Sequence, residues 1–234
     1  MTVAAVLLAA GSGSRVGAGV NKVLLPVCGD AVVTHALRTA LGIAEITRIV
    51  LVVRDGDQRE VADAIVPWLG EREVVLAIGG QTRHASETAA LAALRDDILG
   101  GTVDVVAIHD AARPFATAAL WRAVIEAART HGGALPGLAM PGLIRRDVAS
   151  AGADVVERDL VGVQTPQAFW APDLLEAYDR AAADEFSGTD TAACLARYTE
   201  VRTRVIDGDA RNIKVTFAED LPLADALARR DAPA

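Results

Sequence analysis

Short apolar runs alternate with amphipathic stretches along the 234-residue chain. Near-continuous apolar runs predict strands that are covered on both faces. These runs lie at 3–9, 48–53, 73–78 and 103–109. Between the runs, apolar residues recur every three or four positions, as at Leu120, Val124 and Ala128 within 116–130, which predicts helices with one buried side. Strand–helix alternation of this kind favours a doubly wound, mostly parallel α/β sheet.

The alternation stops between residues 138 and 164. Two short strand-like pieces flank a Gly/Ala/Ser turn near 150–153, which predicts a β-hairpin arm projecting from a single domain over 1–234. A two-stranded ribbon is only marginally stable alone. We therefore expect the arm to pack against a second copy of the chain. The rest of the chain predicts helices near 172–183 and 190–197, a strand near 201–206 and a last helix from about 218.

Composition and charge exclude several functional classes. Hydrophobic residues make up 52% of the chain and aromatic residues 4%, which suits helices packed on a buried sheet. A net charge of −8 argues against nucleic acid and anionic membranes as partners, although a small anion could bind where cations gather in a cleft. No apolar run reaches the roughly 18 residues of a membrane span. The apolar N-terminal stretch lacks a basic region and predicts a strand rather than a signal peptide. Cys28 and Cys194 have no metal or redox spacing, so we expect a cytoplasmic protein.

A glycine-rich loop follows the first predicted strand. Four glycines lie between residues 11 and 19, and Arg15 and Lys22 lie in or just after this segment. The loop is not a dinucleotide fingerprint, because Val16 occupies the place of the third glycine, and it is not a Walker A loop, because Asn21 precedes Lys22. Its backbone N–H groups could cradle phosphates. A flexible connection with solvated charges is the alternative that the loop alone leaves open.

Charged and polar residues also follow other predicted strands. Asp110 and Arg113 come directly after a buried run, although such a pair alone is more often a structural ion pair or a helix cap. The stretch "GGQTRHASE" opens a helix with Ser86 one turn in. The stretch "NIKVT" predicts a late short strand that carries Lys214, whose ammonium would need an anion or water. The four histidines lack ligand spacing and predict structural or solvent-facing roles.

Together these motifs resemble those of the cytidylyltransferases that make 4-diphosphocytidyl-2-C-methylerythritol in the non-mevalonate isoprenoid pathway. The shared motifs are LLAAGSGSR, NKVLLP, GGxxRxxS, HDAARP, RDLVGVQTPQAF, GTDTA and DGDARNIKVTFAEDL. They occur in the family's order and spacing over nearly the whole chain. The resemblance implies a Rossmann-like homodimer of the nucleotide-diphospho-sugar transferase type that uses CTP and Mg²⁺. The implied reaction is cytidylyl transfer to 2-C-methyl-D-erythritol 4-phosphate with release of pyrophosphate.

The resemblance also implies roles for individual residues. Catalytic cations on the triphosphate correspond to Arg15, Lys22 and Lys214. The nucleotide site corresponds to Ala9, Ala10, Gly11, Gly13, Gly80, Gln81, Ser86 and Asp110. The acceptor site corresponds to Arg113, Arg158, Thr165 and Thr189. Asp110 is implied to lie near Mg²⁺, which the CTP phosphates mainly hold, and Arg158 on the arm is implied to reach into the partner's site.

This chain departs from the family pattern mainly in the acceptor half. Gly142 and Leu143 stand where the family usually has Asp-Thr, and one residue is missing between Arg158 and Thr165. A site that has lost hydrogen-bonding groups for a substrate hydroxyl discriminates differently. In the nucleotide half, Gln81 replaces a common Asp, and Asn21 replaces a usual Pro.

Three functions therefore remain compatible with the sequence. The first is cytidylyl transfer from CTP to 2-C-methyl-D-erythritol 4-phosphate. The second keeps this chemistry with ribitol 5-phosphate or another polyol phosphate as acceptor, as the altered arm suggests. The third is a paralogue that binds CTP or CMP without transferring it, against which the presence of all three cations argues.

Overall fold

The computed structural model describes residues 2–11, 21–140, 144–146, 153–155, 160–188 and 190–231, with the backbone alone at 144–146, 153–155 and 231. Within these residues the central sheet has eight strands. Its centre is parallel and consists, in spatial order, of β6 (Val105–Asp110), β1 (Val3–Leu8), β4 (Ile46–Val53) and β5 (Val75–Ile78). These are the four strands predicted from the apolar runs. Because they are parallel, their carboxyl ends meet at one edge of the sheet.

An antiparallel strand extends the sheet beyond β6. This strand, β11 (Gln167–Trp170), lies between β6 and β7 (Gly133–Ala139) and runs against both. Beyond it, β12 (Arg204–Asp207) pairs in parallel with β7, and β10 (Val161–Val163) pairs with β7 in the opposite direction. Since Gln167 pairs with Ile108, the residues just before β11 lie beside the carboxyl end of β6.

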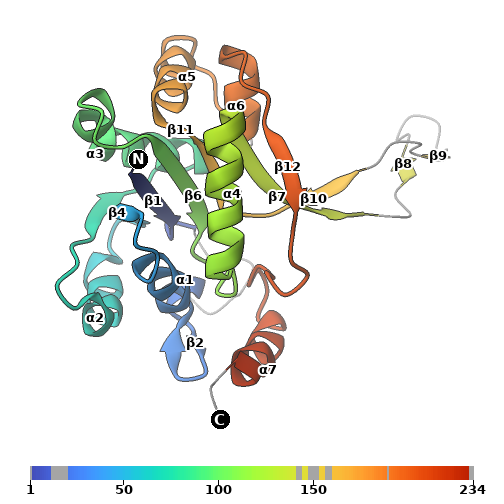
Figure 1. Cartoon of the computed structure of the whole chain (residues 1–234). Coiled ribbons are helices and arrows are strands. Elements are labelled where there is room, and N and C mark those ends of the chain that lie inside the picture. The colour runs from blue at the N-terminus through green and yellow to red at the C-terminus, as the bar shows by residue number, and fades with distance from the viewer. Residues whose placement is uncertain are drawn as a thin grey trace.

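Helices cover both faces of the sheet, as predicted (Figure 1). One buried cluster packs α1 (Val32–Leu41), α2 (Gln58–Leu69) and α4 (Ala118–His131) on one face. The other packs α3 (Arg83–Leu99), α5 (Ala171–Ala183) and α6 (Thr191–Tyr198) on the opposite face. Both faces of the sheet are apolar because side chains alternate along each strand. In β1, Ala5 and Leu7 belong to the first cluster, and Ala4 and Val6 belong to the second. The doubly wound α/β architecture is confirmed.

A third, smaller cluster lies at the edge of the sheet where the parallel strands end. It joins the hairpin of β2 (Pro26–Val27) and β3 (Asp30–Ala31) with α7 (Asp220–Asp231) and with Val215. The short helix η1 (Lys22–Leu24) precedes this hairpin. The prediction that Lys214 lies in a strand is wrong. Its segment crosses the end of the sheet without pairing as a strand, and the Val215 N–H donates to the Ala112 carbonyl at 2.8 Å.

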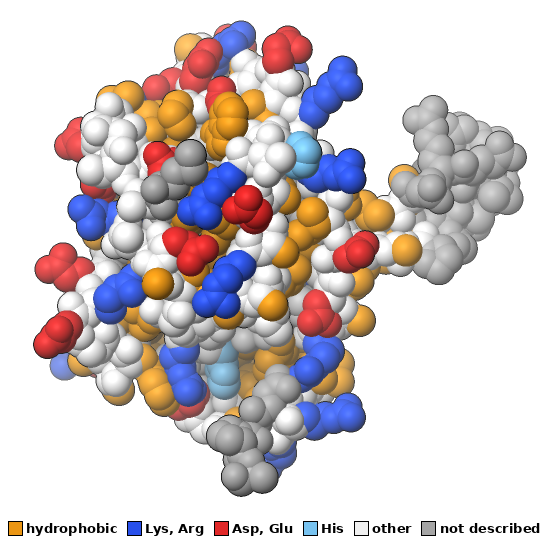
Figure 2. All heavy atoms as spheres, in the orientation of Figure 1, with side chains coloured by type: hydrophobic (Ala, Val, Ile, Leu, Met, Phe, Trp, Pro, Cys, Tyr) orange, Lys and Arg blue, Asp and Glu red, His pale blue; other side chains and the backbone are white. Residues whose placement is uncertain are grey.

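The predicted hairpin arm projects from the sheet (Figure 1). Its strands β8 (Ile144–Arg146) and β9 (Ala153–Val155) pair in antiparallel fashion, and β10 pairs with the end of β7 at its base. Hydrophobic side chains gather where the arm leaves the body (Figure 2). The exposed large apolar residues there are Met140, Leu160, Val161, Val163 and Val205. Among the described helices, none has the length and apolar character that crossing a membrane requires.

Candidate functional site

A cavity of about 510 Å³ lies at the carboxyl edge of the parallel strands. Segments that follow β1, β4 and β5, together with the end of β6, line its wall. This is the edge at which doubly wound sheets bind ligands. Of the predicted site residues that the structure describes, eight line the cavity: Ala10, Gly11, Lys22, Gly80, Gln81, Ser86, Asp110 and Lys214.

The other predicted residues fall into two groups. Ala9, Arg113 and Thr165 are described but do not line the cavity. Ala9 and Thr165 are buried, with 1% and 3% of their surface exposed. The second group lies outside the described residues and consists of Gly13, Arg15, Arg158 and Thr189, together with Gly142 and Leu143 of the arm.

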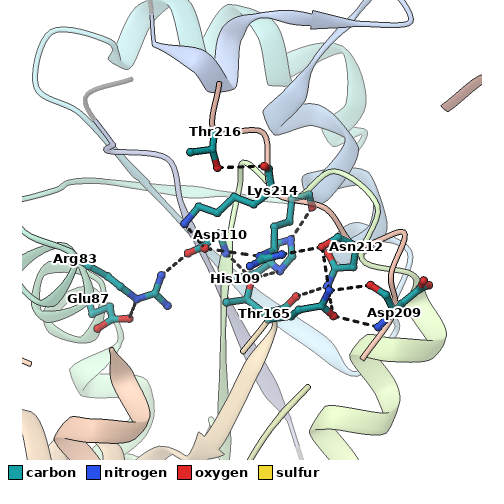
Figure 3. Close-up of polar contacts among 11 residues, drawn as sticks. Arg83, Glu87, His109, Asp110, Thr165, Asp209, Asn212, Lys214 and Thr216 are labelled. Carbon is teal, nitrogen blue, oxygen red and sulfur yellow. Dashed lines mark hydrogen bonds and ion pairs between the residues drawn. The ribbon is translucent and has the colours of Figure 1, made fainter. Parts of the chain in front are cut away.

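Asp110 forms the centre of a charged cluster (Figure 3). Arg83 donates to one of its carboxylate oxygens, and Lys214 Nζ lies 2.7 Å from the other. Arg113 Nε lies 3.9 Å from that second oxygen. Burial by itself would raise the pKa of Asp110, but the charges of Arg83 and Lys214 outweigh it and hold the pKa well below its usual range. Asp110 is therefore an ionised carboxylate surrounded by cations.

A hydrogen-bonded chain fixes the backbone of Asp110. Its N–H donates to Thr165 Oγ1 at 3.0 Å, which leaves the hydroxyl hydrogen for His109 Nδ1, also at 3.0 Å. The other ring nitrogen, Nε2, then donates to the Arg113 carbonyl at 3.0 Å. Burial lowers the pKa of His109 to about 4, so the ring is neutral near pH 7 and keeps this tautomer. The Thr165 hydroxyl is thus engaged within the protein, and its implied contact with an acceptor stays a prediction.

Amide side chains hold the Lys214 segment against the sheet. Asn212 Nδ2 donates to the Thr165 carbonyl at 2.8 Å, and Gln164 Nε2 donates to the Asp209 carbonyl at 2.8 Å. Asn212 is fully buried and 5% of the Gln164 surface is exposed. These bonds connect the segment that carries Lys214 to the strand end that carries Thr165. They explain how residues about a hundred positions apart, Asp110 and Lys214, come into contact.

Two adjacent glycines form the opposite wall. A Cβ on Gly79 would lie 2.5 Å from the Ala10 Cβ, and one on Gly80 would lie 2.4 Å from the Ala85 Cβ. Neither position has room for a side chain, so bare backbone faces the cavity. Helix α3 begins directly after these glycines, where Thr82 Oγ1 accepts from the Ala85 N–H at 3.0 Å.

The sequence reasoning gave no role to Arg83 or Glu87. Arg83 falls in the GGxxRxxS motif and lines the cavity, and its Nε lies 3.0 Å from the buried carboxylate of Glu87. The signal in the sequence was an Arg and a Glu four residues apart in the first turns of a helix. That spacing is typical of solvent-exposed pairs, so it did not indicate a site. Arg54 and Asp55, at the end of β4, also line the cavity without having been predicted.

The donor set suits phosphate ligands better than a permanently bound metal. The described residues contain no group of three or more His, Cys, Asp or Glu side chains that could hold a metal ion. Magnesium sites commonly combine one or two carboxylates with substrate phosphates. Asp110 fits that role as a single carboxylate once phosphates are present. Cations, glycine backbone and one carboxylate at this edge are the groups that an α/β enzyme of the nucleotidyltransferase class needs to bind and position the phosphates of a nucleotide.

Comparison with protein families gives the specific family. A family model described as IspD, 2-C-methyl-D-erythritol 4-phosphate cytidylyltransferase, matches residues 3–230. The chain belongs to this family, and it is a cytidylyltransferase of the nucleotidyltransferase type.

Individual relatives agree with the family assignment. The bifunctional enzyme IspD/IspF of Clavibacter michiganensis is 43% identical over 98% of this chain, which spans 55% of that relative. The 2-C-methyl-D-erythritol 4-phosphate cytidylyltransferase of Geobacillus kaustophilus is 32% identical over 97% of both chains. The chain therefore spans about half of the bifunctional relative and nearly all of the single-function one.

Solved structures show the same fold. The 4-diphosphocytidyl-2C-methyl-D-erythritol synthase of Anaerococcus prevotii matches with a TM-score of 0.85 and 27% identity, over 98% of this chain and 99% of that one. The 2-C-methyl-D-erythritol 4-phosphate cytidylyltransferase of Thermus thermophilus matches with a TM-score of 0.77 and 28% identity, over 98% and 100% of the two chains.

Proposed function

We propose that this chain transfers the cytidylyl group of CTP to 2-C-methyl-D-erythritol 4-phosphate, which gives 4-diphosphocytidyl-2-C-methylerythritol and pyrophosphate in non-mevalonate isoprenoid biosynthesis. Family membership supports this function. The structural observation that carries it is the cavity lined by Lys22, Lys214 and Arg83, in which Lys214 and Arg83 contact the Asp110 carboxylate.

The chemistry needs positioning and charge neutralisation rather than a nucleophile from the protein. An oxygen of the acceptor phosphate attacks the α-phosphorus of CTP, and the bond from that phosphorus to the bridging oxygen breaks. Pyrophosphate leaves with the electron pair. Lys22 and Lys214 stabilise the charge that develops on the phosphate oxygens, and removal of one such preorganised group typically lowers the rate by ~10²–10³-fold. The bare backbone at Gly79 and Gly80 lets the nucleotide approach closely.

We also propose Mg²⁺ as the cofactor, held by Asp110 and the phosphates of CTP. When bound, the ion withdraws charge from the phosphates and aids the departure of pyrophosphate. Asp110 is kept ionised for this role by Arg83 and Lys214, and the Thr165 hydroxyl orients its backbone.

We further propose a cytoplasmic homodimer that forms through the 138–164 arm. The exposed apolar side chains at the arm's base, among them Val161 and Val163, would be covered by a second copy. Arg158 would then act in the partner's site. Mixing Arg158→Ala chains with Lys22→Ala chains should restore part of the activity through hybrid dimers. Demonstrated heterodimers without recovered activity would rule out action across the interface.

Pyrophosphate release is the direct test of the transfer. Wild-type protein should release pyrophosphate with CTP, Mg²⁺ and 2-C-methyl-D-erythritol 4-phosphate, and faster than with ribitol 5-phosphate. Turnover with ribitol 5-phosphate alone would move the acceptor assignment to that polyol. Tight CTP binding without pyrophosphate release on any polyol phosphate would reduce the chain to a nucleotide-binding protein.

A further inference from the structure

A buried carboxylate lies behind the cavity wall, and the proposed mechanism does not use it. Only 1% of the Glu87 surface is exposed. One of its oxygens lies 3.0 Å from Arg83 Nε and accepts from Thr191 Oγ1 at 2.6 Å. Its other oxygen accepts from the Tyr178 hydroxyl. Thr191 and Tyr178 are themselves buried, so the group is removed from water.

Such a carboxylate is stable only where its partners compensate it. Burial raises the pKa of Glu87, and Arg83 and the hydroxyls of Thr191 and Tyr178 offset only part of that rise, so the pKa stays above its usual range. These partners belong to three helices, because Glu87 and Arg83 lie on α3, Tyr178 on α5 and Thr191 on α6. Glu87 is therefore a rigid anchor, and the partner of Glu87 that reaches the cavity is Arg83.

Arg83 is held at two points. Its guanidinium lies between Glu87 and Asp110, with Nε on the first carboxylate and Nη1 on the second (Figure 3). Nε and Nη2 are both buried without a hydrogen-bond partner among the described residues, so the 3.0 Å approach of Nε to Glu87 is an ion pair. A guanidinium presents its nitrogens as a planar fork that matches phosphate oxygens. Arg83 lines the cavity with 24% of its side chain exposed, and Nη1 is the nitrogen that contacts Asp110 there.

The second anchor matters when a nucleotide arrives. Phosphates and a metal ion compete with Arg83 for Asp110, and an arginine tied to Asp110 alone would be free to leave the cavity wall. Glu87 keeps the guanidinium at that wall, so less side-chain freedom is lost on binding. We infer that Arg83 is a further phosphate-binding residue for CTP, and that Glu87 is the positioning residue that holds it in the cavity. This inference rests on the proposed function, because it requires a nucleotide in this cavity.

Calorimetry tests the inference. It measures the binding of CTP with Mg²⁺ and, separately, the binding of cytidine, both in the absence of the acceptor. Arg83→Gln should weaken CTP binding by about ten- to a hundredfold, the range for hydrogen bonds to charged groups, and leave cytidine binding unchanged. Glu87→Gln should weaken CTP binding by a smaller factor. The double variant should bind CTP no more weakly than Arg83→Gln, because Glu87 acts only through Arg83. Arg83→Lys should retain part of the affinity, since it keeps the charge and loses the fork.

The exposed pair Arg59 and Asp63 on α2 supplies matched controls. These residues have the same four-residue spacing with a 4.0 Å contact, and Arg59→Gln and Asp63→Asn should leave CTP binding unchanged. Thermal unfolding identifies variants that do not fold. If Glu87→Gln does not fold, Tyr178→Phe replaces it. This variant removes the hydroxyl that donates to Glu87 and leaves the Glu87 side chain itself unchanged.

Each negative outcome has its own meaning. Wild-type protein that does not bind CTP refutes the proposed function. If the wild type binds, then wild-type CTP affinity in Arg83→Gln, or an equal loss of CTP and cytidine binding, overturns the role of Arg83. Additive losses in the double variant overturn the positioning role of Glu87.

Discussion

Acid should weaken the folded state through His109, whose ring is fully buried. Its Nδ1 accepts from the Thr165 hydroxyl and its Nε2 donates to the Arg113 carbonyl, so both ring nitrogens are in use in the neutral form. Burial lowers the pKa of His109 from its ordinary value of 6.5 to about 4. Between these two values the unfolded chain binds a proton that the folded chain does not. The free energy of unfolding must therefore fall as the pH is lowered through this interval.

The size of the loss follows from the two pKa values. One pKa unit corresponds to about 1.36 kcal/mol, so the interval from 6.5 to about 4 is worth about 3 kcal/mol of unfolding free energy from this one ring. The contribution is fully present above pH 6.5. It is lost progressively as the pH falls, and the loss is complete near pH 4, where the folded ring also takes up its proton.

Urea unfolding at intervals between pH 7.5 and 4 measures this loss. Other groups titrate over the same range, so the informative quantity is the difference in pH dependence between the wild type and His109→Gln. His109→Gln should lose about 3 kcal/mol less than the wild type over the interval, whatever its stability at pH 7.5. His131→Gln, at an exposed histidine, should behave like the wild type. Equal pH dependence in His109→Gln and the wild type would refute the reasoning.

Three further substitutions test the site. Lys22→Ala should lower kcat by ~10²–10³-fold and weaken CTP binding much less, because its charge matters most in the transition state. Thr165→Val should lower the free energy of unfolding by about 2–4 kcal/mol in urea, since the Asp110 N–H and His109 Nδ1 lose their buried partner. Gly79→Ala should cost about 1–3 kcal/mol by the same measurement, because its Cβ would meet that of Ala10 at 2.5 Å.

Each of these three has a contradicting outcome. Equal losses of kcat and CTP affinity in Lys22→Ala would give Lys22 a binding role only. Thr130→Val removes an exposed hydroxyl and serves as the control for Thr165→Val, and equal effects of the two would contradict the proposed network. Gly42→Ala, where the added Cβ meets only ordinary contacts of 3.5 and 3.6 Å, is the control for Gly79→Ala, and an equal loss of stability in the two variants would contradict the steric argument.

The parallel half of the fold could be predicted from the sequence, because strands buried on both faces leave uninterrupted apolar runs. The sequence also predicted Lys22, Asp110 and Lys214 as site residues, because they follow such runs or match the family motifs. All three line one cavity: the parallel topology brings the end of β6 with Asp110 there, whereas tertiary contacts bring Lys214. The amphipathic helix near 116–130 was equally visible and corresponds to α4.

Other features leave no local pattern. Strand β11 has four residues, and its pairing with β6 and β7 is decided by segments far away in the chain. Lys214 lies between apolar residues and therefore resembled a strand residue, whereas tertiary contacts fix its segment. Glu87 was missed because its burial depends on hydroxyl groups from α5 and α6. Long-range partners of this kind cannot be deduced from spacing in one helix.

The hydrogen bonds of Gln164 bear on how the arm can change in sequence during evolution. Gln164 is the last residue of the 138–164 arm and directly precedes Thr165. Its side chain donates to the Asp209 carbonyl and its N–H donates to the Pro136 carbonyl. The arm therefore joins the domain at a residue that has its own hydrogen bonds to the domain. We expect changes in the length and sequence of the arm to leave Thr165 and the Asp110 backbone in place. Under the proposed function, dimerisation and acceptor preference would then vary among related chains while the CTP site stays the same.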